Sequence, residues 1–272
     1  GGFLGMRQGR LEAAQARLDR ALSLAPEGSQ AVSMALAGLA AVAARSGRRD
    51  DERALQQRAV EAARARGDRV RLANVLESLG AACSSRGDFD GADEALTQAA
   101  EAYRQVGVPS PTLGIHRAEL ALERGHWAEA ELRAQEAAGA ARSLQRPRFV
   151  ALARSAEGRA LVCGGHLERA ERVLADAEAA LEGVARAQAR VRVWRAVVGA
   201  RRGAAAVAQS LLATAPAPRE EDVPLWGWAT AEVARALGDE DRVAELWAEH
   251  HEATATADHL VRHLWARLVD GD

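Results

Sequence analysis

The sequence predicts an all-α protein built from about six to seven antiparallel helix pairs. Three observations predict this class: glycines recur at near-constant spacing, small residues hold fixed offsets from them, and isoleucine and tyrosine, which favour strands, are scarce. The glycines are separated by 38, 40, 38, 40, 38 and 35 residues, and such a period is typical of an array of similar helical hairpins. They are Gly9, Gly47, Gly87, Gly125, Gly165, Gly203 and Gly238.

Small residues at three offsets from these glycines predict closely packed helix axes. They lie seven residues before, five after and twelve after the glycine, as Ala118, Ala130 and Ala137 do around Gly125. Small side chains allow the ridges of one helix to enter the grooves of the next. Each glycine is expected to end the first helix of a pair in a left-handed conformation, which has no steric cost for glycine.

The segments between these turns have the composition of helices. They are rich in Ala, Leu, Arg, Glu and Gln, which are strong helix formers. Ile115 is the single isoleucine and Tyr103 the single tyrosine, so two of the residue types that favour strands are nearly absent. Residues 69–84 and 92–106 each keep an apolar stripe at three- and four-residue steps, which indicates helices with one buried face.

Prolines divide the chain into an array and a divergent end. We predict repeats over residues 1–215, a proline-rich loop over 216–224 and a divergent capping repeat over 225–272. A terminal repeat must cover the end of the apolar layer, so an atypical sequence is expected there. An aromatic contact surface for another domain or partner is the alternative, because four of the six tryptophans follow the loop: Trp226, Trp228, Trp247 and Trp265.

Composition excludes several function classes. The net charge of −2 leaves no basic excess to neutralise phosphates, so we expect no direct binding to nucleic acid. All 36 basic residues are arginine, which excludes the lysine of a phosphate-binding P-loop. The sequence contains no run of 18 apolar residues, so no transmembrane helix is expected. We expect a cytoplasmic chain in which Cys83 and Cys163 are unpaired. We also expect the chain to be a fragment of a longer protein.

No motif in the chain has the pattern of an active site. Cys163 and His166 could form a nucleophile pair, but both fall in a predicted repeat turn. His259 and His263 lie one helical turn apart and could share a metal ion, although exposed histidines on a terminal helix are the simpler interpretation. We therefore predict no catalytic residues, no metal site and no cofactor.

The repeated columns resemble the tetratricopeptide repeat. The motif is Leu79-Gly80, then Gly87-Asp88-Phe89, then Ala92 and Ala99. HEAT and armadillo arrays have similar periods, but the small–glycine–small register argues against them. The long period resembles that of MalT-like LuxR regulators, to which Arg7–Ala14 is similar, and of proteins with caspase-like CHAT domains, to which Ala102–Pro109 is similar.

The resemblance implies a right-handed α–α superhelix in which the first helix of each pair lines a concave groove. Groove positions in this family imply ten partner-binding residues, which make a groove that is acidic in its middle and basic and aromatic toward its end. They are Asn74, Glu77, Ser84, Glu119, Glu123, Arg159, Arg190, Arg201, Trp228 and Arg235. The lysine–asparagine clamp of the chaperone-binding members is absent, so capture of a chaperone C-terminus is not expected.

We therefore expect a non-enzymatic scaffold that binds a protein or peptide. It would be the sensor or interaction segment of a larger multidomain bacterial regulator, and the resemblance to those arrays implies one of actinobacterial type. The partner would be a protein or peptide in the groove, another domain of the same polypeptide or a second copy, with no membrane contact. A small-molecule sensing domain near Trp226 and Trp228 is the alternative function, and a solvated face or a structural spacer remains open.

Overall fold

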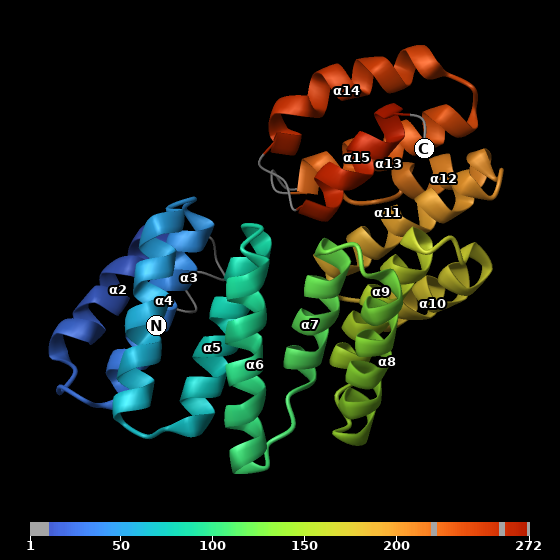
Figure 1. Ribbon diagram of the computed structural model, residues 1–272. Coiled ribbons are helices and arrows are strands. Elements are labelled where there is room, and N and C mark those ends of the chain that lie inside the picture. Colours follow the sequence, from blue (N-terminus) through green and yellow to red (C-terminus); the bar gives the residue numbers. More distant parts are fainter. Residues whose placement is uncertain (1–10, 219–221, 256–258, 271–272) are drawn as a thin grey trace. The chain divides into compact units, whose positions relative to one another are not determined.

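The computed structural model describes residues 11–218, 222–255 and 259–270, and these form helices and turns without a strand (Figure 1). The predicted all-α class is therefore confirmed. The chain divides into two compact units, which the sequence analysis did not anticipate. Unit 1 extends to Pro109 without Ser85–Gly87, and unit 2 contains Ser85–Gly87 and the chain from Ser110 onward.

The helices of unit 1 are two successive pairs preceded by one further helix. They are α2 (Leu11–Leu24), α3 (Gln30–Arg45), α4 (Arg49–Ala65), α5 (Arg69–Ser85) and α6 (Phe89–Val106). The helix α6 begins at a side-chain cap, because Asp88 accepts a hydrogen bond from the amide of Gly91 at 3.1 Å.

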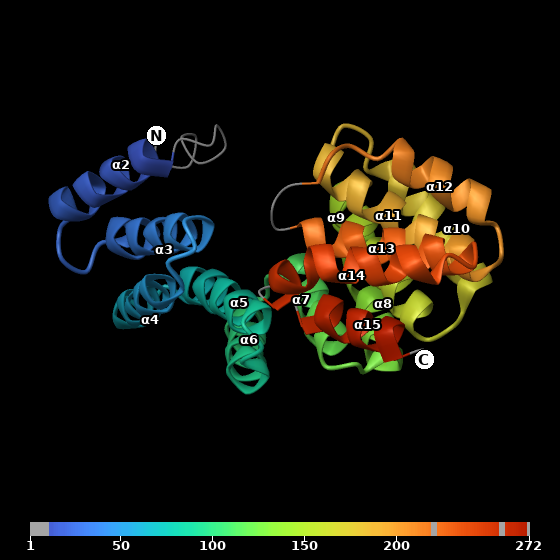
Figure 2. The same ribbon diagram turned by 90° about the horizontal axis from the view of Figure 1, so that it is seen from above.

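The helices of unit 2 continue the same alternation. They are α7 (Pro111–Glu123), α8 (Trp127–Ser143), α9 (Pro147–Cys163), α10 (Leu167–Ala180), α11 (Ala185–Arg201), α12 (Ala205–Ala213), α13 (Val223–Ala236), α14 (Glu240–Ala255) and α15 (His259–Asp270). Consecutive helices from α7 to α14 pack against each other, and α7, α9 and α11, the first helices of three pairs, follow one another in space (Figure 2).

The predicted turn glycines end the first helix of each described pair. Gly47, Gly87, Gly125, Gly165, Gly203 and Gly238 all have φ between 70° and 79°, the left-handed region that favours glycine. After Gly165, the amide of His166 donates to the carbonyl of Leu161 at 2.8 Å, which closes the end of α9. The predicted turn at Gly9 and the small position at Gly2 lie outside the described residues.

The small columns bring the two helices of a pair together as predicted. At the position five residues after the turn glycine, Ala92, Ala130 and Ala170 are all fully buried. At the position seven residues before it, Gly158 approaches α10 so closely that an added Cβ would lie 2.3 Å from Cδ2 of Leu174. These contacts follow from side-chain size alone, because larger residues would separate the axes.

The last three helices of unit 2 bury two of the tryptophans that follow the proline-rich loop. Trp228 on α13 and Trp265 on α15 are both fully buried. The helix α15 packs on α13 and α14 and also contacts α7, beside which it lies in Figure 2. The predicted boundaries at 216 and 225 and the capping role remain predictions. None of the helices in the described part of the chain is long and apolar enough to span a bilayer.

Candidate functional site

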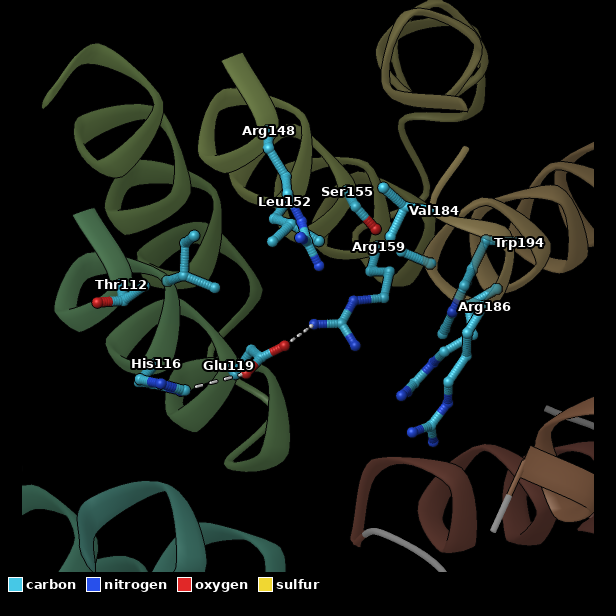
Figure 3. Close-up of a pocket in the computed structure, with 13 residues that line it drawn as sticks. Thr112, His116, Glu119, Arg148, Leu152, Ser155, Arg159, Val184, Arg186 and Trp194 are labelled. Carbon is cyan, nitrogen blue, oxygen red and sulfur yellow. Dashed lines mark hydrogen bonds and ion pairs between the residues drawn. The ribbon is translucent and has the colours of Figure 1, made fainter. Parts of the chain in front are cut away.

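A cavity of about 390 Å³ opens between the first helices of three successive pairs in unit 2 (Figure 3). Thirteen residues line it. From α7 come Thr112, Ile115, His116 and Glu119; from α9 come Arg148, Leu152, Ser155 and Arg159; and from α11 and the residue before it come Val184, Arg186, Ala187, Arg190 and Trp194. We call this cavity the α7–α9–α11 pocket.

Helical periodicity places these residues together. On α9 the pocket residues are spaced by four, three and four positions, and on α7 by three, one and three, so each set lies on one helix face. Small residues on the adjoining faces of α7 and α9, such as Ala118 and Ala156, are buried in the core and hold these helices in place. The same pattern that builds the fold therefore points the polar side chains into the pocket.

An ion pair connects two walls of the pocket. The guanidinium of Arg159 donates to Glu119 Oε1 at 3.2 Å, and Nδ1 of His116 lies 3.6 Å from Glu119 Oε2. Figure 3 shows the Glu119 and Arg159 side chains directed toward each other from α7 and α9. Burial raises the pKa of Glu119, but the hydrogen bond from His116 and the charges of Arg159, His116 and Arg190 outweigh it and lower the pKa to about 2.

This ion pair is open to solvent on one side. The Glu119 side chain is 44% exposed and that of Arg159 is 12% exposed. Solvent screens such a pair, so its contribution to stability is small. The Nε atom of Arg159 is buried and has no hydrogen-bond partner among the described residues.

Further arginines make the pocket cationic. Arg186 binds the buried Asp222, its Nε lying 2.9 Å from Oδ2, and Arg190 lies 3.8 Å from the same carboxylate. Arg148 is exposed at the start of α9 and has no hydrogen bond or ion pair with the described residues. The four lining arginines therefore face two carboxylates, Glu119 and Asp222.

One wall of the pocket is apolar. Ile115 and Trp194 are buried and Leu152 is half-buried, and all three line the cavity. Trp194 packs against the buried Trp228 in a tilted arrangement, with ring centroids 5.2 Å apart and an interplanar angle of 56°, so its ring is supported from behind. The pocket thus combines a rigid apolar wall with several guanidinium groups.

Three of the predicted site residues meet at this pocket: Glu119, Arg159 and Arg190. Arg201 and Arg235, also in unit 2, lie elsewhere. Arg201 forms a two-point ion pair with Glu232 at 3.2 and 2.5 Å, and Arg235 lies 3.6 Å from Glu240. Partner binding by these residues remains a prediction.

Two predicted groove positions of unit 2 are not open. The prediction that Trp228 is exposed is wrong, because its ring is fully buried against Trp194 and lies under the Arg201 guanidinium at 5.7 Å. Glu123 is engaged by α15: its Oε2 accepts from the amide of Leu260 at 2.6 Å, and its carbonyl oxygen lies 2.9 Å from Nδ1 of His259.

The predicted residues of unit 1 form no comparable site. Glu77 and Ser84 are buried, so the prediction that they are exposed in a groove is wrong for both. The Tyr103 hydroxyl lies 2.9 Å from Glu77 Oε2 and 2.6 Å from Oδ1 of Asn74, which is exposed. These side chains therefore join α5 to α6 inside unit 1.

The sequence analysis missed several pocket residues, including Arg148, Arg186 and Trp194. Arg148 and Arg186 each lie seventeen residues before a turn glycine. This is one helical turn beyond Asn74 and Arg190, which lie thirteen residues before theirs and are the predicted positions furthest from a glycine. Extending the groove register by that turn would have found both arginines. Trp194 lies nine residues before Gly203, where His116 also lies relative to Gly125, so this register position also faces the pocket.

The two motifs considered for catalysis and metal binding take part in packing contacts within the fold. Burial raises the pKa of the Cys163 thiol to about 12, so this group is a poor nucleophile at neutral pH. The ring of His263 lies 6.4 Å from that of Trp127, while His259 contacts α7 through Glu123. Within the described residues, no group of three or more metal-ligating side chains is arranged to hold an ion.

Comparison with known proteins identifies the type of repeat. Residues 31–105, which span α3 to most of α6, match the tetratricopeptide repeat family. No curated protein sequence matches the chain.

Solved structures resemble the chain over nearly its whole length. A tetratricopeptide repeat protein from Parabacteroides merdae ATCC 43184 has a TM-score of 0.63 at 14% identity, covering 98% of this chain and 96% of its own. A Rap protein in complex with Competence and Sporulation Factor has a TM-score of 0.70 at 13% identity, covering 96% and 80%. Pseudomonas aeruginosa pilF has a TM-score of 0.55 at 12% identity, covering 88% and 97%. The chain therefore has a tetratricopeptide-like helical-repeat fold.

Proposed function

We propose that the chain is a non-enzymatic scaffold that binds a protein or peptide partner on the face formed by α7, α9 and α11. The observation that carries this proposal is the α7–α9–α11 pocket, because it is concave, combines apolar and charged side chains, and lies on the first helices of three successive repeats. A Rap protein of similar fold was solved in complex with Competence and Sporulation Factor, which supports a binding role for this fold.

We further propose that this scaffold is the sensor or interaction segment of a larger cytoplasmic bacterial signalling protein. The resemblance of its long repeats to those of MalT-like and CHAT-containing proteins supports this assignment. Under it, the effector reaction belongs to another domain, and the partner is a protein, a second copy or a neighbouring domain.

A charge reversal in the pocket tests the proposed face. The full chain is used as bait in cells of its native host, with Arg159→Glu as the test variant and Arg172→Glu as a matched control on the exposed surface of α10. Recovery of the partner is expected to fall about tenfold or more with Arg159→Glu, because the change reverses a charge on the proposed face and repels a partner group that complements it. Recovery with Arg172→Glu is expected to equal that of the unchanged chain.

Two further measurements complete this test. Circular dichroism checks that Arg159→Glu is folded, since the change places two carboxylates together. The exchange variant Glu119→Arg/Arg159→Glu restores an ion pair with reversed direction and serves as the folded alternative. Equal recovery by the unchanged chain, the exchange variant and Arg172→Glu contradicts the proposed face.

A small-molecule sensing domain is the second candidate function. The specific observation in its favour is the size of the pocket, whose volume of about 390 Å³ falls within the range usual for small-molecule sites. The aromatic region first considered for such a ligand is less suited to it, because Trp228 is fully buried.

A further inference from the structure

We infer that the α7–α9–α11 pocket is a binding site for a small organic anion, in which a carboxylate or phosphate group is joined to an apolar body. The inference rests on the second candidate function, a small-molecule site in this pocket, and specifies the chemistry of that ligand. Three features of the pocket carry it: unused guanidinium donors, an apolar wall and an internal carboxylate that competes with the ligand.

The unused donors come from three arginines. Arg148 has no polar partner among the described residues, Arg190 reaches only to 3.8 Å from Asp222, and the buried Nε of Arg159 has no hydrogen-bond partner there. A guanidinium presents five N–H donors in a planar fork that matches the oxygens of a carboxylate or phosphate. Buried donors without partners cost free energy, and an anion would supply the missing acceptors.

The charge balance favours an anion over a neutral ligand. Four arginines line the pocket, and Glu119 and Asp222 are the carboxylates they contact, so these six side chains carry a formal charge of two positive units. Since Arg186 already binds Asp222 through two hydrogen bonds, the remaining charge lies toward Arg148 and Arg190.

The apolar wall indicates an organic ligand rather than an inorganic ion. Ile115, Leu152 and Trp194 line the cavity together with the arginines, and the packing of Trp194 against the buried Trp228 supports this wall. A ring or short hydrocarbon chain placed there would bury apolar surface, while its anionic group reached the guanidinium groups. Figure 3 shows Arg148 and Leu152 on α9 directed into the same space.

The carboxylate of Glu119 competes with such a ligand. It is half-exposed to the pocket and accepts a hydrogen bond from Arg159 at 3.2 Å. A bound anion would therefore be repelled by Glu119 and would find Arg159 partly occupied. Removing this charge should increase the affinity for an anion, whereas loss of a purely structural residue would not.

Isothermal titration calorimetry on the full chain tests the inference with defined probes. The anionic probes are 3-phenylpropionate and phenyl phosphate, and the controls are the neutral 3-phenylpropanol and inorganic phosphate. At least one anionic aromatic probe is expected to bind at least about tenfold more tightly than either control, a difference of about 1.4 kcal/mol. The tighter of the two anionic probes identifies the preferred headgroup.

Four variants locate the site. Arg148→Gln and Arg190→Gln are each expected to weaken the better anionic probe about tenfold, the usual loss for a charge-assisted hydrogen bond. Arg172→Gln on the exposed surface of α10 makes the same charge change outside the pocket and is expected to leave the affinity unchanged. Glu119→Gln is expected to strengthen binding about threefold. Arg148 has no partner to lose, so its variant keeps the fold.

Three results overturn the inference: no binding of either anionic probe, equal binding of 3-phenylpropanol, or equal affinities of Arg148→Gln, Arg190→Gln and Arg172→Gln. The proposed scaffold function fails separately. If no probe binds while partner recovery still depends on Arg159, the anion site is wrong and the scaffold stands. If probes bind as expected but partner recovery is the same with Arg159→Glu as with the unchanged chain, the anion site stands and the partner face is wrong.

Discussion

Replacing Trp265 by alanine is expected to lower the free energy of unfolding of unit 2 by about 3–5 kcal/mol, the usual cost of emptying a large aromatic site. The Trp265 ring is fully buried, and its centroid lies 5.4 Å from that of Trp247. Its indole Nε1 donates to the carbonyl of Pro224 at 3.0 Å. The alanine variant would lose this hydrogen bond and leave a cavity among α13, α14 and α15.

The loss should extend beyond α15. Leu260 and Leu264 of the same helix are buried in the largest core cluster of unit 2, and Leu260 also donates its amide to Glu123 on α7. All six tryptophans lie in unit 2, so the fluorescence of the remaining five follows its unfolding in urea. Leu237→Ala is the control, because Leu237 is exposed and its loss should cost less than about 0.5 kcal/mol. Equal costs for the two variants would contradict this role of α15.

Gly158→Val is expected to destabilise unit 2 by about 3 kcal/mol, at the upper end of the usual cost of overpacking. A Cβ at this position would lie 2.3 Å from Cδ2 and 2.5 Å from Cγ of Leu174. Leu174 is fully buried and cannot move into solvent, so α9 and α10 must separate. Unit 1 repeats this contact, since a Cβ at Gly80 would lie 2.6 Å from Cγ of Leu96.

Gly139→Val is the matched control. Gly139 lies within α8, is exposed, and has no atom within 4 Å of an added Cβ. Valine has a slightly higher helix propensity than glycine, so this change should stabilise unit 2 by roughly a few tenths of a kcal/mol. Urea unfolding followed by tryptophan fluorescence compares the two variants. Destabilisation by Gly139→Val equal to that by Gly158→Val would show that glycine loss, not helix contact, is responsible.

Much of the fold could be predicted because one pattern recurs. The turn glycines from Gly47 to Gly238 adopt the left-handed conformation that their position requires. The alanines five residues after them, such as Ala130 and Ala208, are fully buried. A constraint that repeats with the period of the chain is visible in one sequence, whereas a contact that occurs once is not.

A second series of turns was visible in the sequence but was not recognised. Gly28, Gly67, Gly107 and Gly183 also have positive φ and lie in the turns between one pair and the next. Gln145 takes the equivalent position with φ of 53°. A glutamine there carries no sequence signal for a left-handed turn, and only its spacing from Gly107 and Gly183 could have indicated it.

The site could be predicted only in part. The register that identified Glu119 and Arg159 depends on helical periodicity, and the structure places both in the pocket. The same register chose Glu123 and Trp228, which are covered by α15 and α11 because of contacts that occur once in the chain. Pairing of residues far apart in sequence, such as Arg186 with Asp222, has no periodic signal.

The most direct test of the pocket as a binding site is an NMR titration of the ¹⁵N-labelled chain with the anionic probe that calorimetry finds to bind more tightly, 3-phenylpropionate or phenyl phosphate. The indole Nε1 of Trp194 is buried without a hydrogen-bond partner in the described part of the chain, and its ring lines the cavity. The Trp194 indole signal, assigned with Trp194→Phe, is expected to shift on binding, while the signals of Trp247 and Trp265 stay in place. An unchanged Trp194 signal, or shifts confined to Trp247 and Trp265, would contradict the assignment of the α7–α9–α11 pocket.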